Sequence, residues 1–329
     1  MPKAPLSDRI YKYVTAALCA SALVYIFLIL VILFQYSYPS IVVNGLKFFT
    51  TTVWNPGSLG SNIVTKDGFS VVQGSSYGLL VYLEGTLVTS ALAIVFGVPV
   101  SIAIAIFLSQ MAPRRFRPPI SFLVELLAGI PSVVYGFWGI LILGPFLLNS
   151  AEPFLRAHLG FIPGFGGYVY SYGLLASGLI LALMIVPIVA SISRDVMVQA
   201  PLELREGAKA LGLTDWEITR KVVLPYAKTG IVGAVILGLG RALGETMAVA
   251  LVSGGANITI RSVYSPINTL AAFMATSLDG AFVDPTKQNV YALVELAVVL
   301  VVLTMLVNIL ARALVKQGFF KSSEGVVRV

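Results

Sequence analysis

The sequence is poor in charge, cysteine and histidine. Only 11% of its 329 residues are charged, against roughly a quarter in an average soluble domain, and 57% are hydrophobic. This composition argues against a water-soluble fold. The lone cysteine, Cys19, excludes an intrachain disulfide, and with the lone histidine, His158, far away along the chain it makes no metal site.

The chain also lacks a phosphate-binding loop. No Gly-x-x-x-x-Gly-Lys-Ser/Thr run is present, and the dipeptide Gly-Lys does not occur. We therefore predict no nucleotide, cofactor or metal site in this chain. The net charge of +7 could suggest nucleic acid in a soluble protein, but the basic residues lie mostly in short loops between apolar runs. We expect no nucleic-acid partner.

Long apolar runs are what the sequence has in abundance. A membrane-spanning helix needs about 20 mainly apolar residues. Six stretches qualify: 14–34, 79–108, 120–144, 171–192, 229–252 and 290–313. The first is too long for a signal-peptide core, and no small-residue cleavage site follows it, so we interpret it as a retained span. The sequence predicts an all-α integral membrane protein in lipid, with a cytoplasmic N-terminus (1–13) and a single transmembrane domain (14–329).

The distribution of Lys and Arg predicts the orientation. Sixteen of the 22 fall in the two termini and in the 109–119 and 193–228 loops, whereas five fall in the opposite loops. The positive-inside rule places the larger group in the cytoplasm. We expect a multi-pass protein of the cytoplasmic membrane with both termini inside, and outer loops at 35–78, 145–170 and 253–289 that cap the bundle.

The 193–228 loop is the most informative cytoplasmic segment. Pro201 and the good helix formers after it predict a helix that Gly212 ends. Thr214, with Glu217 three residues later, forms a capping box for a second helix, which we expect Pro225 to close. The sequence therefore predicts two short helices, at an angle to each other, beneath the membrane.

This loop resembles one shared by permease subunits of bacterial and archaeal ABC importers. That pattern is Glu-Ala-Ala, three residues, Gly, nine residues and Ile-x-Leu-Pro, and its spacing is kept here by Glu206, Gly207, Ala208, Gly212, Val222, Leu224 and Pro225. The resemblance implies that residues 201–225 couple the chain to a separate ATPase dimer, with Ala208 and Leu211 filling a pocket of the ATPase. On this interpretation, Ala208→Asp abolishes coupling without abolishing membrane insertion.

Ionisable residues inside spans are costly and are candidates for function. Arg241 is the only basic one, and Glu245, four residues on, lies on the same helix face and can pair with it. The pair is either structural or part of a pathway in which the planar donor fork of Arg241 meets an anion. In the second case Glu245 keeps binding weak enough for release. We expect Glu125 near the inner end, paired with a loop arginine, and we assign no role to Glu295.

Two further segments resemble phosphate ABC transporter permeases of the PstC type: Gly238–Val249, in the fifth span, and Glu125–Gly136, in the third. With the loop, the resemblance covers most of residues 79–313. It implies the type I ABC importer permease fold, inorganic phosphate as substrate, and Arg241 and Glu245 as transport-pathway residues. The implied partners are an ABC ATPase dimer, a second, PstA-like permease and an extracytoplasmic phosphate-binding protein.

Other functions stay open from the sequence. A permease for sulfate, molybdate or tungstate would need similar pathway chemistry. An ion-coupled secondary transporter would need no ATPase, and the 206–225 pattern would then be accidental. A membrane-embedded enzyme would need clustered nucleophiles, bases or metal ligands, whereas the spans hold scattered carboxylates and one arginine. We therefore predict a transport subunit and not an enzyme.

Overall fold

The computed structural model describes residues 6–58 and 62–323, which are almost entirely helical. The helices, in chain order, are α1 (Leu6–Asn44), α2 (Lys47–Thr50), α3 (Leu80–Ile106), α4 (Arg117–Ala128), α5 (Ser132–Trp138), α6 (Gly144–Phe146), α7 (Glu152–Leu159), α8 (Leu174–Val198), α9 (Leu202–Ala210), α10 (Asp215–Ile218), α11 (Leu224–Gly244), α12 (Met247–Val252), α13 (Leu270–Ala281) and α14 (Gln288–Ser323). Four π-helical turns join some of them: η1 (Phe107–Met111), η2 (Gly139–Leu143), η3 (Leu147–Ala151) and η4 (Thr219–Val223).

Helix α8 forms the centre of the bundle. It packs against α3 and α11, and 72% of its most apolar stretch is buried. Small residues let the neighbours come close: a β-carbon on Gly97 of α3 would lie 3.0 Å from the carbonyl oxygen of Ala182. Such close backbone approach is how helices gain packing energy in lipid, where the hydrophobic effect does not drive them together.

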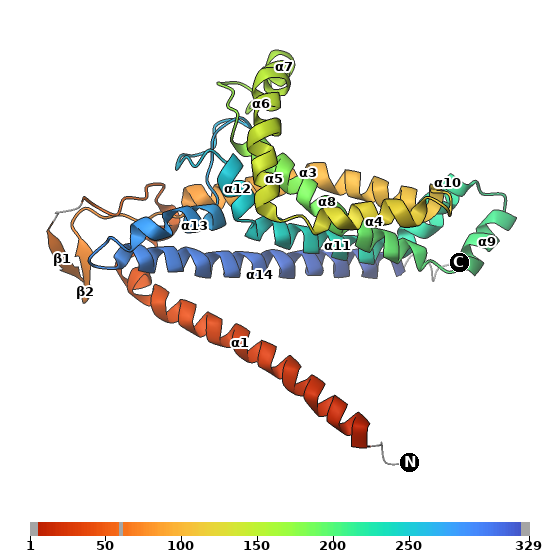
Figure 1. Cartoon of the computed structure of the whole chain (residues 1–329), viewed down its shortest axis with the longest axis horizontal. Coiled ribbons are helices and arrows are strands. Elements are labelled where there is room, and N and C mark those ends of the chain that lie inside the picture. Colours follow the sequence, from red (N-terminus) through yellow and green to blue (C-terminus); the bar gives the residue numbers. More distant parts are fainter. Residues whose placement is uncertain (1–5, 59–61, 324–329) are drawn as a thin grey trace.

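The bundle has two distinct ends (Figure 1). Helices α3, α8, α11 and α14 run along its long axis, with α9 and α10 at one end and the strands at the other. We call these the α9 end and the hairpin end. The start of α1 and the end of α14 both lie toward the α9 end.

A β-hairpin, which the sequence analysis did not predict, accompanies the helices. Strands β1 (Ile63–Lys66) and β2 (Phe69–Val72) pair antiparallel. The turn between them is Asp67-Gly68, whose φ angles of 51° and 86° are those of a tight hairpin turn. Beside the hairpin, aromatic residues form a core in which Tyr82 stacks on Phe273 at 4.0 Å between ring centroids.

The described part of the chain contains six helices long and apolar enough to span a membrane: Ile10–Asn44, Leu80–Met111, Ser132–Leu159, Leu174–Val198, Asp215–Gly244 and Gln288–Ala313. The number agrees with the prediction, and the second, fourth and sixth keep their predicted places. None of the most apolar stretch of the first is buried, and α1 packs mainly on α14. A helix this apolar and this exposed needs lipid or another apolar chain around it.

The third span was predicted wrongly at 120–144. Helix α4 ends at Ala128, and after a break at 129–131 a new continuous helix runs from Ser132 to Leu159 at a steep angle to α4 (Figure 1). Pro131 causes the break, because it has no amide hydrogen and disfavours the helical conformation in the residue before it. Residues 145–159 are therefore helical, where an irregular outer loop was expected.

Candidate functional site

The fifth predicted span, 229–252, is broken where its charges lie. Helix α11 ends at Gly244, Glu245 is extended with φ −70° and ψ 128°, and α12 starts at Met247. The Glu245 carboxylate turns to the new helix and accepts a hydrogen bond from the Ala248 N–H, with Oε1 3.4 Å from the nitrogen.

The Arg241–Glu245 ion pair that the spacing allows therefore does not form. The two side chains would share a face only if the helix continued through Glu245. Among the described residues, the ion pairs within 4.0 Å join other partners, and neither of these two takes part. The interpretation of these two residues as an ion pair that only stabilises the fold is therefore not supported.

Arg241 lies on an open face of α11. Its side chain is exposed, and β-carbons built on Gly240 and Gly244 would meet no atom within 4 Å. The last turn of a helix carries partial negative charge, which favours a cation there. A guanidinium free of carboxylates keeps its donor fork available for the oxygens of an anion.

The two segments singled out in the sequence pack against each other. Helix α5 lies on α12, and Gly136 is so close that a β-carbon there would stand 3.2 Å from the Ala248 Cα. The Tyr135 hydroxyl donates to the Leu127 carbonyl across the α4–α5 break, at 2.8 Å. Two interrupted helices thus meet beside Arg241. Irregular backbone at membrane depth is tolerated where protein or a water-filled cavity surrounds it.

The 193–228 loop follows the prediction in its first half. Helix α9 ends next to Gly212, whose φ of +83° suits glycine, and Thr214 and Glu217 form the predicted capping box. Pro225 does not close a second helix: α10, η4 and α11 are continuous from Asp215 to Gly244. The π-helical turn η4 precedes Pro225, and its wider hydrogen-bonding pattern accommodates the ring.

The two faces of α9 have different surroundings. Ala208 is 8% exposed and packs into the chain's own core with residues such as Met197 and Val223. A residue that fills a pocket of the ATPase would have to point outward, and Ala208 does not. Glu206 and Gly207 are exposed, and Leu211 is 82% exposed.

Glu125 is paired as predicted. Its Oε1 lies 3.2 Å from Nη2 of Arg194, near the end of α8, and the same guanidinium contacts Asp195 at 2.7 Å. Glu295, to which no role was assigned, is buried in α14 at 3% exposure with Oε2 unpartnered.

Comparisons with known proteins decide the family. The family described as "Binding-protein-dependent transport system inner membrane component" matches residues 97–317. Phosphate transport system permease protein PstC 1 of Mycobacterium tuberculosis is 44% identical over 279 residues, covering 83% of this chain and 82% of the relative. PstC of Mesorhizobium japonicum is 41% identical over 311 residues, covering 93% and 89%. The chain belongs to the PstC family of inner membrane transport components.

Solved structures show the same fold. A bacterial alginate ABC transporter in complex with alginate pentasaccharide-bound periplasmic protein matches with a TM-score of 0.57 and 16% identity, covering 94% of this chain and 98% of that one. An inward-facing MetNI methionine ABC transporter matches with a TM-score of 0.51 and 20% identity, covering 73% and 96%. At these identities the likeness concerns the fold, and the predicted ABC importer permease fold is confirmed.

PstC membership settles several predictions at once. The chain is a multi-pass inner membrane protein and a permease subunit, as predicted, and not an enzyme. A binding-protein-dependent ABC system implies an ATPase and a binding protein as partners. The alternatives of an ion-coupled secondary transporter and a membrane-embedded enzyme are therefore excluded.

Proposed function

We propose that this PstC family member is one of two permease subunits of an ATP-driven importer of inorganic phosphate, with residues 14–329 acting as one transmembrane domain. The observation that carries the proposal is the unpaired guanidinium of Arg241 on an open helix face. The names of the relatives, phosphate transport system permease proteins, support phosphate as the substrate. Arg241 binds the anion in transit, and Glu245 nearby keeps the binding weak enough for release.

A second permease supplies the other wall of the pathway. On α11, Gly233, Gly240 and Gly244 each have open space where a side chain would be, and they recur at intervals that share one face. Glycine faces allow another helix to approach closely. A related, PstA-like subunit opposite this face encloses Arg241 between two chains.

The α9 end faces the cytoplasm in this proposal. The unequal distribution of Lys and Arg among the loops supports this orientation. The start of α1 and the end of α14 both lie toward the α9 end, which agrees with it. The exposed side of α9, with Glu206 and Gly207, docks on the ATPase dimer. Because α10 and α11 are continuous, a movement at the 201–225 segment passes through Leu224 and Pro225 to Arg241, while Gly212 sets the angle between the helices. The binding protein docks at the hairpin end.

Another tetrahedral oxyanion is the second candidate substrate. The fork of a single arginine fits sulfate, molybdate or tungstate about as well as phosphate. In the proposed complex, selectivity then rests mostly on the binding protein.

The test uses the complete transporter in proteoliposomes, with uptake and ATP hydrolysis measured for Arg241 and for Arg241→Gln. We expect phosphate to stimulate hydrolysis and uptake in the wild type and neither in a mutant that still assembles. Arg241→Lys, which keeps the charge but not the fork, should retain part of the activity. Normal uptake by Arg241→Gln would remove Arg241 from the pathway, and a response to another oxyanion alone would overturn the substrate assignment.

A further inference from the structure

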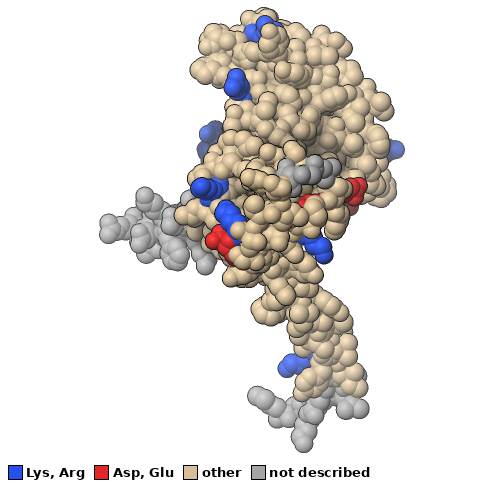
Figure 2. All heavy atoms as spheres, turned by 90° about the vertical axis from the view of Figure 1, so that its left-hand side faces the viewer, with Lys and Arg blue, Asp and Glu red and all other residues tan. Residues whose placement is uncertain are grey.

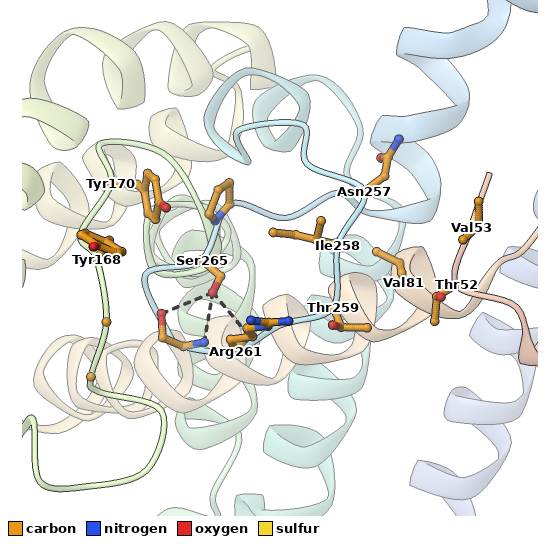
Figure 3. Close-up of a pocket in the computed structure, with 14 residues that line it drawn as sticks. Thr52, Val53, Val81, Tyr168, Tyr170, Asn257, Ile258, Thr259, Arg261 and Ser265 are labelled. Atoms are coloured by element: carbon orange, nitrogen blue, oxygen red, sulfur yellow. Dashed lines mark hydrogen bonds between the residues drawn. The ribbon is translucent and has the colours of Figure 1, made fainter. Parts of the chain in front are cut away.

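A pocket of about 560 Å³ lies at the hairpin end, where four segments of the chain meet. Its lining includes Thr52, Tyr168, Tyr170, Asn257, Thr259 and Arg261. Figure 3 shows Arg261 between the two tyrosines on one side and Thr52 on the other. We call this cavity the Arg261 pocket.

Within residues 6–58 and 62–323, Arg261 is the only charged residue that lines this pocket, and no carboxylate does so. Its side chain is exposed and, among the described residues, takes part in no ion pair within 4.0 Å. The carboxylate of Glu84, on α3, lies beside the same loop, where Oε2 accepts the Ile260 N–H at 3.4 Å. Seen from the hairpin end, the surface is mostly uncharged, with separated basic groups and little acid (Figure 2). The pocket thus offers a free cation surrounded by hydroxyl and amide groups.

The backbone that carries Arg261 is held in place. The Ser265 hydroxyl accepts hydrogen bonds from the N–H groups of Arg261 and Ser262, at 3.4 and 3.0 Å. The same loop pairs with the start of α8, where the Leu174 N–H donates to the Ser265 carbonyl at 2.9 Å. A binding group on a fixed backbone loses little conformational freedom when a ligand arrives.

Helix α12 lies between Arg241 and Arg261 in the chain. It begins at Met247, two residues after Glu245, and leads into the loop that carries Arg261, which closes on it through the Ile267 N–H and the Ser253 carbonyl at 2.8 Å. Six residues of helix advance about 9 Å along the axis. Arg241 thus precedes α12 by six residues and Arg261 follows it by nine, and neither is in an ion pair among the described residues.

We propose that the Arg261 pocket is a receiving site for one hydrated tetrahedral oxyanion, which passes from it to Arg241. This inference rests on the proposed function. The pocket is large enough for the ion with part of its water shell, and its arginine, hydroxyl and amide donors suit anionic oxygens. An acidic side chain of the docked binding protein is the competing occupant.

The first experiment detects the anion without the binding protein. Cys19→Ala removes the only native thiol of this chain, and Thr259→Cys, labelled before the subunit is assembled with its partners in lipid nanodiscs, carries an environment-sensitive fluorophore in the pocket. Inorganic phosphate should change its emission when Arg261 is present, and Arg261→Gln should weaken the apparent affinity about tenfold or more, as expected for a lost charge-assisted hydrogen bond. Arg261→Lys should fall between.

Arg156→Gln is the matched control, since Arg156 is an exposed arginine on α7 that does not line the pocket. It should leave the response unchanged. The same response in Arg261→Gln as in the parent, or no response to phosphate or sulfate in any variant, would overturn the proposal. A response to sulfate alone that depends on Arg261 supports the receiving site and overturns the assignment of phosphate.

The second experiment separates the anion from the binding protein. Phosphate uptake and the docking affinity of the binding protein are measured on the same nanodisc or vesicle samples. We expect Arg261→Gln to reduce uptake while docking stays within about twofold, because a rim charge contributes little to protein–protein affinity. If docking weakens by the same factor as uptake, Arg261 holds the binding protein, and the receiving site is refuted.

Discussion

Gly136 of α5 lies against Leu251 of α12 so closely that a β-carbon on Gly136 would stand 2.5 Å from the Leu251 Cδ1. The backbone of α12 is also near, at 3.2 Å from that position to the Ala248 Cα. The rotation of Leu251 alone cannot make room, so a side chain at 136 must push α12 away from α5. This contact joins α5, which follows the break at 129–131, to α12, which follows the break at Glu245.

Gly136→Val should therefore destabilise the protein and slow transport. Overpacking of this kind costs about 1–3 kcal/mol. Gly280→Ala, in α13, is the matched control: its β-carbon meets no atom within 4 Å, so the change should leave stability equal or raised by about 0.5–1 kcal/mol. Thermal unfolding in detergent and uptake in vesicles check both. Equal melting temperatures for the two variants would show that α5 and α12 can move apart at little cost in stability.

The sequence predicts well those features that depend on neighbouring residues. The capping box of Thr214 and Glu217 and the stop at Gly212 follow from local backbone chemistry, and the structure confirms them. Asp67-Gly68 is an equally local signal, typical of a tight hairpin turn, and the hairpin could have been predicted from it. Spans that consist of one unbroken helix can be predicted from the sequence, because crossing the lipid requires about 20 apolar residues in a row.

The features that were missed depend on direction or on distant contacts. Hydropathy does not record that Pro131 turns an apolar run into two helices with different directions. Nothing as strong as a proline marks the break at Glu245, so helical spacing suggested a pair with Arg241 that does not form. The Arg261 pocket combines four segments of the chain, and no local pattern could reveal it.

The ion pair between Arg194 and Glu125 fastens α4 to the end of α8. The Arg194 side chain is 18% exposed and Glu125 is 53% exposed, so solvent screens the pair partly. Glu125→Gln should cost at most about 1 kcal/mol, because Arg194 keeps Asp195 as a partner. Arg194→Gln should cost more, since it removes both contacts. Thermal unfolding of the two variants compares them, and a larger loss for Glu125→Gln would contradict the geometry.

The break after Gly244 predicts that Arg241 and Glu245 act independently on stability. A double-mutant cycle with Arg241→Gln, Glu245→Gln and the combined variant should give a coupling energy below about 0.5 kcal/mol. A structural ion pair would give a larger value. The free energy of unfolding in detergent is the readout. Strong coupling would mean that the two side chains meet in a state of the transporter other than the one described.

The face of α9 that meets the ATPase can be tested with two substitutions of the same kind. Ala208 is buried in the chain's own core, so Ala208→Asp places an unpaired carboxylate among apolar side chains and should cost more than about 2 kcal/mol. The sequence led us to expect that this variant loses coupling but still inserts into the membrane; the buried position adds a loss of stability to that expectation. Leu211 is 82% exposed at the end of the same helix, and Leu211→Asp should leave the melting temperature nearly unchanged. If the exposed side of α9 docks on the ATPase, Leu211→Asp purifies without the ATPase or with uncoupled hydrolysis, because the charge enters an apolar contact.

Melting temperature and co-purification are measured on both variants. A stable Ala208→Asp protein that loses the ATPase, together with a Leu211→Asp protein that retains it, would show that the Ala208 side of α9 faces the ATPase.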